Sequence, residues 1–198
     1  MITFALAVFL LLITPGPGVL TLAGVGSAFG YKPGFRYLLG LLIGQNLVAI
    51  AVVSGLAAIL LAAPIVRNIL LVLSVGYLCF LAYKIAFSGT KTAFAGAQKE
   101  PGISGGVMLQ AINPKAYVVN TSFFTGFAIW PDNFTAEISY KFVAMNVIWI
   151  SIHILWLAIG VTINRLNLAP RTQFIINIAM ALALLSVIFL ALWTQFYR

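Results

Sequence analysis

A lysine lies inside an apolar stretch of this sequence. Lys115 follows Asn113-Pro114, in a run from Gly102 to Trp130 that contains no other charged residue. The run is long enough to cross a bilayer, so we expect the ammonium group near its middle. A charge at that depth costs about 2.5–3.5 kcal/mol on insertion scales, and such charges usually mark a functional site. Lys115 is therefore the first candidate for binding an anionic group such as a carboxylate.

A second irregularity interrupts the first apolar run at a similar depth. Here the chain reads Thr14-Pro15-Gly16-Pro17-Gly18. Proline disrupts a helix interior but is favourable in the first turn of a new helix, with Thr or Asn before it as the N-cap. Thr14-Pro15 and Asn113-Pro114 therefore each predict the start of a half-helix.

Two half-helix N-termini that meet near the midplane would form an anion site. Each offers free N–H groups and the positive end of a helix dipole. Gly16 and Gly18 lack side chains and would let a ligand approach the backbone. We expect Thr14–Gly18 and Asn113–Lys115 to hold a substrate carboxylate, with Lys115 as the counter-charge. The alternative is that both breaks are packing kinks and that Lys115 snorkels to an interface.

The composition indicates an integral membrane protein of the all-α class. Of its 198 residues, 63% are hydrophobic and 7% are charged, whereas soluble domains carry about 25% charged residues. A spanning helix needs about 20 apolar residues. Six segments meet this requirement and are predicted to span the membrane: Ile2–Ala28, Tyr37–Ala62, Pro64–Ala86, Ile103–Phe127, Phe142–Ile163 and Thr172–Phe196.

The connections are short, and a turn is expected at Lys32-Pro33-Gly34. We predict one membrane domain, 1–198, with a first half of about 1–87, a loop at 88–102 and a second half of about 103–198. Each half contains three helices, so a tandem repeat would insert upside down. The sequence therefore predicts an inverted 3+3 repeat in which helices 1 and 4 are broken.

The formal net charge is +8, but the cations lie mainly in short loops. This pattern indicates topology determinants and no nucleic-acid partner. The loops after helices one, three and five carry Lys32, Arg36, Lys84, Lys91, Lys99, Arg165 and Arg171. The opposite side carries Arg67, Lys141 and Arg198. The positive-inside rule then predicts that both termini lie outside.

The other polar candidates lie on helices two, three, four and five. Asn146, Trp149, His153, Trp156 and Gly160 share one face of the fifth helix. That face is either a wall of the substrate cavity or a helix–helix seam. Gln45 and Asn46 on helix two either line the cavity or bond to a neighbouring helix, and Tyr77 on helix three is a candidate cavity residue. Gln110 makes helix four polar, as suits a helix that lines a pore. The small residues Gly40 and Gly44 permit close packing either within the chain or in a homodimer.

The expected spans lack the residue types that most catalytic and metal-binding sites use. No Asp or Glu lies in an expected span, and Cys79 is the only cysteine. We therefore predict no enzyme activity, no cofactor and no metal site. Without a carboxylate relay, Lys115 and His153 are the candidates for proton coupling. Lys115 is favoured because it lies at a helix break.

Three segments together are similar to a known family. Thr14-Pro15-Gly16-Pro17, Gly76-Tyr77-Leu78 and Asn113-Pro114-Lys115-Ala116 resemble those of LysE/RhtB proteins, the lysine-exporter and homoserine/threonine-efflux type. The resemblance covers essentially the whole chain. Many members carry Asp or Asn directly after the Pro-Gly-Pro, whereas this chain has Gly18.

The resemblance implies a secondary transporter of the bacterial cytoplasmic membrane. Such a protein would export an amino acid or a related small zwitterion, driven by an ion gradient, with the proton as the expected ion. Its partners would be this substrate and the bilayer. The alternative is an exporter or channel for an inorganic ion or another small solute, because a lysine in a pore also favours anions.

Overall fold

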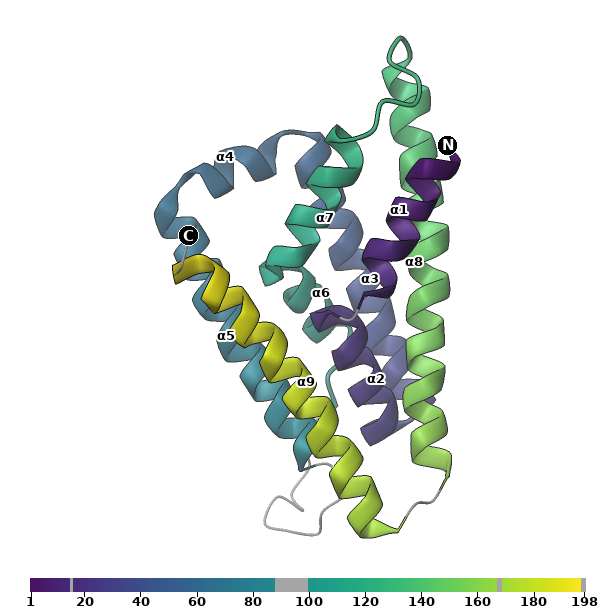
Figure 1. Cartoon of the computed structure of the whole chain (residues 1–198), viewed down its shortest axis with the longest axis vertical. Coiled ribbons are helices and arrows are strands. Elements are labelled where there is room, and N and C mark those ends of the chain that lie inside the picture. The colour runs from purple at the N-terminus through teal and green to yellow at the C-terminus, as the bar shows by residue number, and fades with distance from the viewer. Residues whose placement is uncertain (15, 88–99, 167–168, 197–198) are drawn as a thin grey trace.

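The computed structural model describes residues 1–14, 16–87, 100–166 and 169–196, which form helices and no strand. Within these ranges the helices run in the order shown in Figure 1. They are α1 (Ile2–Ile13), α2 (Pro17–Phe29), α3 (Tyr31–Val53), α4 (Leu56–Ala62), α5 (Pro64–Ala86), α6 (Ile103–Ile112), α7 (Pro114–Thr125), α8 (Phe134–Arg165) and α9 (Pro170–Phe196).

Three of the described helices are long and apolar enough to cross a membrane. These spans are α3, Pro64–Tyr83 of α5 and Phe134–Ile163 of α8. A fourth span results if α1 and α2 count as one broken helix, bent by 53°. The all-α class is confirmed, whereas the count of six spans and the inverted repeat stay predictions.

Both expected helix breaks are present, but only one has the predicted cap. Asn113 is the N-cap of α7, and its side chain accepts a hydrogen bond from the Lys115 backbone N–H. Thr14 was expected to cap the second half-helix, and this is wrong. Its hydroxyl donates to the Leu10 carbonyl of the preceding turn, so Thr14 ends α1, while Gly16 is the N-cap of α2. Pro15 lies outside the described residues.

The predicted second helix has different ends in the structure. Gly30, with φ of 80°, separates α2 from α3, and Pro33 lies in the first turn of α3, where its missing N–H is harmless. The expected turn at Lys32-Pro33-Gly34 is therefore wrong. The helix also ends at Val53 because Gly55 adopts the left-handed conformation with φ of 77°, and α4 follows.

The fifth predicted helix starts a full two turns earlier than expected. Asn133 caps α8 by accepting from Ala136 N–H, and Glu137 lies in its first turn. Lys141 is fully buried and donates to the carbonyls of Phe124 and Phe127 and to Glu137. The expectations that Lys141 is a loop cation and that spans contain no acid are thus corrected: this pair fastens the end of α7 to α8.

The two halves of the chain interleave. The most extensive packing joins α3 to α6 and α2 to α8, and α5 lies beside α9 (Figure 1). Glycines permit the close approach: a Cβ at Gly40 would lie 2.0 Å from the Ile103 carbonyl oxygen, and one at Gly160 would lie 2.1 Å from that of Ala23. Gly40 and Gly44 face α6, which confirms the internal-packing alternative for these two residues.

This packing predicts a contrast between two glycine substitutions. Gly160→Ala places a methyl group against backbone that cannot move aside, and overpacking of this kind costs about 1–3 kcal/mol. We expect the apparent melting temperature in detergent to fall by about 2–4 °C for each kcal/mol. Gly76 has open space around its missing Cβ, so Gly76→Ala is the matched control and should not lower it. Equal melting temperatures for the two variants would contradict this packing.

Candidate functional site

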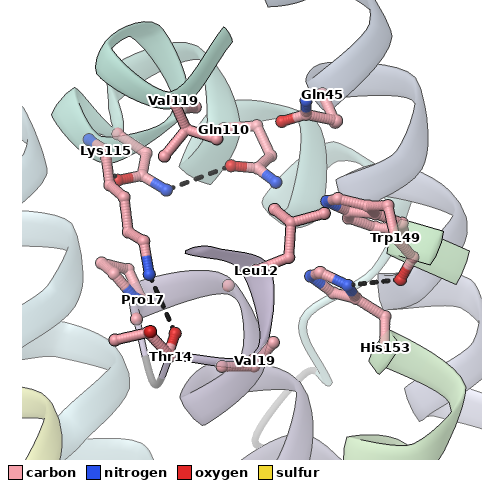
Figure 2. A pocket seen from close by; sticks show the side chains of 14 residues that line it. Leu12, Thr14, Pro17, Val19, Gln45, Gln110, Lys115, Val119, Trp149 and His153 are labelled. Atoms are coloured by element: carbon pink, nitrogen blue, oxygen red, sulfur yellow. Dashed lines mark hydrogen bonds between the residues drawn. The ribbon is translucent and has the colours of Figure 1, made fainter. Parts of the chain in front are cut away.

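The two helix breaks meet at one pocket between α1, α2, α3, α6, α7 and α8. The first break contributes Thr14, Gly16, Pro17 and Gly18, and the second contributes Asn113 and Lys115. Trp149 and His153 of α8 form another wall. Figure 2 shows Lys115 and His153 reaching the pocket from opposite sides. The structure therefore brings residues from both breaks together with the Trp149–His153 face that the sequence singled out.

A hydrogen bond joins the two breaks directly. The Lys115 Nζ donates to the Thr14 carbonyl oxygen at 2.8 Å, across 101 positions of the chain (Figure 2). That oxygen belongs to the C-terminal end of α1, where unpaired carbonyls and the negative end of the helix dipole favour a cation. The bond leaves further protons on the ammonium group for a ligand.

The absence of a side chain at Gly16 leaves room for the Lys115 ammonium group. A Cβ at position 16 would lie 3.0 Å from both Cδ and Nζ of Lys115. The lysine side chain therefore lies directly against the backbone of the first break. Gly16 has ordinary extended dihedral angles, so the absence of a side chain matters here for close approach and not for backbone strain.

The two half-helices offer different groups to a ligand. The first turn of α7 is already satisfied, because Asn113 accepts from Lys115 N–H through its side chain and from Ala116 N–H through its carbonyl. The first turn of α2 has no side-chain cap, and no acceptor among the described residues takes the N–H groups of Gly18 and Val19. The expected helix-terminus site for an anion thus lies at α2, with Lys115 facing it from α7.

His153 and Trp149 form a stacked pair on α8. Their ring centroids are 3.4 Å apart with an interplanar angle of 15°, and His153 Nδ1 lies 2.8 Å from the Trp149 carbonyl oxygen. Both side chains are buried. Further along α8, Gly160 packs against Ala23 of α2. Both alternatives for the polar face of this helix therefore hold in part. The face lines the pocket near Trp149 and packs against another helix near Gly160.

Asn46 and Asn146 do not line the pocket. Their side-chain amides exchange two hydrogen bonds of 2.9 Å and thereby join α3 to α8. Each amide also donates to a carbonyl one turn earlier in its own helix. Pro114 also lies outside the lining residues.

Tyr77 lies one layer away from the pocket and is linked to it through polar contacts. Its hydroxyl donates to the Gly105 carbonyl at 3.0 Å, and it neighbours Tyr37. The Tyr37 hydroxyl donates to Thr21 Oγ1 at 3.2 Å, and Thr21 donates to the Pro17 carbonyl at 2.6 Å. This buried chain, which sequence reasoning did not single out, braces the first turn of α2.

Gln45 and Gln110, which the sequence offered as possible cavity residues, both line the pocket, whereas the apolar wall was not foreseen. Gln45 donates to Asn120 at 3.0 Å, and Gln110 accepts from Asn113 at 3.1 Å. The apolar side chains that complete the lining are Leu12, Val19, Ala116 and Val119, and they look like ordinary membrane-helix residues in the sequence.

The pocket has an unbalanced charge and little free space. Lys115 is the one cation among its lining residues, and no carboxylate lines it. The cavity volume is about 40 Å³, far below the ~300–1,000 Å³ typical of ligand pockets. A molecule larger than a few waters can therefore enter only if the surrounding helices separate. Among the described residues, no group of three His, Cys, Asp or Glu could hold a metal ion.

The contact between Gly16 and Lys115 predicts coupling between two substitutions. Gly16→Ala displaces the ammonium group and should weaken its bond to Thr14, at a cost of about 1 kcal/mol. This corresponds to a fall of about 2–4 °C in apparent melting temperature. In a Lys115→Ala background the three atoms nearest to the added methyl group are absent, so the cost of Gly16→Ala should largely disappear. Additive effects in this double-mutant cycle would contradict the geometry.

Comparison with known proteins agrees with the motifs. The chain is 28% identical over 130 residues to a leucine efflux protein of Enterobacter sp. (strain 638), covering 63% of this chain and 62% of that protein. It is 29% identical over 126 residues to a leucine efflux protein of Klebsiella pneumoniae, covering 61% and 59% of the two chains. The matched part thus spans about three fifths of these relatives, and no solved structure matches the chain. The family model of the LysE type translocators matches residues 9–194, and the chain therefore belongs to that family.

Proposed function

We propose that this protein exports amino acids with apolar side chains from the cytoplasm, with leucine as the first substrate to test. The observation that carries the proposal is the composition of the pocket: one ammonium group at two helix ends, beside a wall of aliphatic side chains. The first binds a carboxylate, and the second suits an aliphatic side chain. The leucine efflux proteins among the relatives support the same substrate class.

Carboxylate binding follows from the charges at the breaks. Lys115 Nζ already donates to the Thr14 carbonyl and keeps protons for a second acceptor. The N–H groups of Gly18 and Val19 supply further donors at the positive end of α2. A substrate carboxylate placed between them would bind both half-helices at once. Asn113 maintains this arrangement by capping α7.

The small cavity supports an alternating-access cycle. Substrate entry requires the helices around the pocket to separate, and the break between α1 and α2 supplies a hinge at the site itself. Pairing of α1 and α2 with α8 parallels pairing of α6 and α7 with α3, as an inverted repeat of two three-helix halves would require. We infer a secondary transporter of one domain, coupled to a proton gradient through Lys115 or His153.

A second candidate function is export or passage of a small inorganic anion. The observation that favours it is the lone cation without a carboxylate among the lining residues. The two candidates differ in what they expect of the apolar wall, because an inorganic anion gains nothing from aliphatic contacts. Competition of leucine export by other aliphatic amino acids, and not by chloride or phosphate, would decide for the amino acid.

Replacement of Lys115 tests the proposal directly. We expect Lys115→Ala to lower leucine counterflow in proteoliposomes by about ten- to 100-fold, because a charge-assisted hydrogen bond to the carboxylate is lost. Lys32→Ala removes an exposed lysine away from the pocket and is the matched control. Normal counterflow by a well-inserted Lys115→Ala protein would contradict the proposed role.

The orientation proposed for the bacterial cytoplasmic membrane places both termini outside. The excess of cations in the loops on one side supports this orientation. Two of these cations, Lys91 and Lys99, lie outside the described residues. The junction of α2 and α3 and the turn before α8 lie at opposite ends of the molecule (Figure 1).

Cysteine labelling measures this orientation. In a Cys79→Ser background, a cysteine at exposed Asp132 should react with an impermeant thiol reagent in intact cells, and one at exposed Lys32 should not. Each variant is the control for the other. The reverse pattern would show that the termini lie inside.

A further inference from the structure

The hydrogen bond of His153 fixes which ring nitrogen is available to the pocket. Nδ1 lies 2.8 Å from the Trp149 carbonyl oxygen, and a carbonyl can only accept. Nδ1 therefore carries a hydrogen, and in the neutral ring the lone pair lies on Nε2. Stacking on Trp149 holds the ring in this orientation. The side chain is 4% exposed, so the orientation is set by protein contacts and not by bulk water.

Nε2 points into the pocket and has no partner there. Figure 2 shows the free edge of the His153 ring directed toward the space between α2 and α6. No donor among the described residues bonds to Nε2. The missing Cβ of Gly18 would lie 3.5 Å from this nitrogen and 3.8 Å from Gln110 Nε2. Glycine at position 18 thus leaves room for a ligand atom beside the imidazole.

The pocket needs an acceptor for the second charge of a zwitterion. Its carbonyl and amide acceptors are mostly used: Thr14 by Lys115, Trp149 by His153, and Gln110 by Asn113. Among the side chains that line the pocket, the acceptors left are His153 Nε2 and the amide oxygen of Gln45, whose amide nitrogen is bonded to α7. His153 approaches from the side opposite Lys115 (Figure 2), as the two ends of an amino acid require.

We propose that His153 Nε2 accepts a hydrogen bond from the ammonium group of the substrate, and that a proton at the same nitrogen displaces it. This inference rests on the proposed function. It adds the group that binds the substrate's ammonium group and the step that couples substrate release to proton binding. The nitrogen holds one partner at a time, so release of the substrate frees the lone pair for a proton from solution. Exchange of one for the other needs no carboxylate.

The surroundings of His153 leave few other titrating groups to explain such exchange. Lys115 on α7 is the other titratable residue that lines the pocket. From α2, α3 and α6 the pocket receives Gly18, Gln45 and Gln110, none of which titrates near neutral pH. On α8 itself, Glu137 and Lys141 are paired with each other at the far end of the helix.

The test compares two ligands that differ in the ammonium group. Leucine and 4-methylpentanoate share a carboxylate and an aliphatic chain, but the second lacks the amine. Binding to the purified full-length protein is measured by calorimetry as the pH is lowered stepwise from about 8 to the most acid pH at which the protein stays folded. We expect leucine binding to weaken toward acid pH, by up to about tenfold per pH unit, while 4-methylpentanoate binding does not weaken. A proton taken up at Lys115 would affect both ligands, because both present a carboxylate.

Two variants separate hydrogen bonding from proton uptake. His153→Gln keeps an acceptor that does not titrate, so leucine should bind with its acid weakening removed. His153→Phe keeps an aromatic ring against Trp149 but no acceptor, so leucine affinity should fall by about tenfold or more, with 4-methylpentanoate unaffected.

The outcomes distinguish this inference from the proposed function. Should the wild-type protein bind leucine with the same pH profile as 4-methylpentanoate, the role of His153 is overturned and amino-acid export stands. Unchanged leucine affinity in His153→Phe also overturns it and points to Gln45. If the wild-type protein binds no aliphatic amino acid, both proposals fail. The wild-type comparison needs no variant, so poor folding of a substituted protein does not affect it.

Discussion

The bond from Lys115 to the Thr14 carbonyl is the contact on which the site depends. It joins the start of α7 to the end of α1, so the two interrupted helices meet at one charged group. A lysine in an apolar helix is costly unless its ammonium group finds acceptors. Here the acceptor exists only because α1 stops and exposes a carbonyl. The charge and the break therefore stabilise each other, and neither is expected to persist without the other.

The two breaks differ in chemistry although they look alike in sequence. Asn113 satisfies the first turn of α7, whereas Gly16 leaves the first turn of α2 without a side-chain cap. Among the described residues, the backbone N–H groups without an acceptor thus belong to one half of the chain, and the ammonium group belongs to the other. An anion bound between them would hold both halves together, which gives a physical route from ligand binding to movement of the helices.

Close packing and buried polar pairs hold the helices around this pocket together. Glycines at 40, 44 and 160 bring helix backbones into contact, and the Asn46–Asn146 pair fastens α3 to α8. Lys141 and Glu137 hold the far end of α7. Such polar contacts carry weight in lipid because no water competes for the same groups. The pocket therefore lies among helices that close backbone contacts and buried polar pairs hold together.

The sequence by itself determined the membrane class, the bounds of α5, both breaks and the position of Lys115 at one of them, because apolar length and proline act locally. It misplaced the cap at Thr14 and the start of α8, since those depend on which of several nearby hydrogen bonds forms. Only the tertiary structure decided that Gln45 and Gln110 line the pocket, that Asn46 and Asn146 bond to each other, and that His153 faces Lys115. Helical periodicity places a side chain on a face, but the neighbour of that face is chosen by packing between helices far apart in the chain.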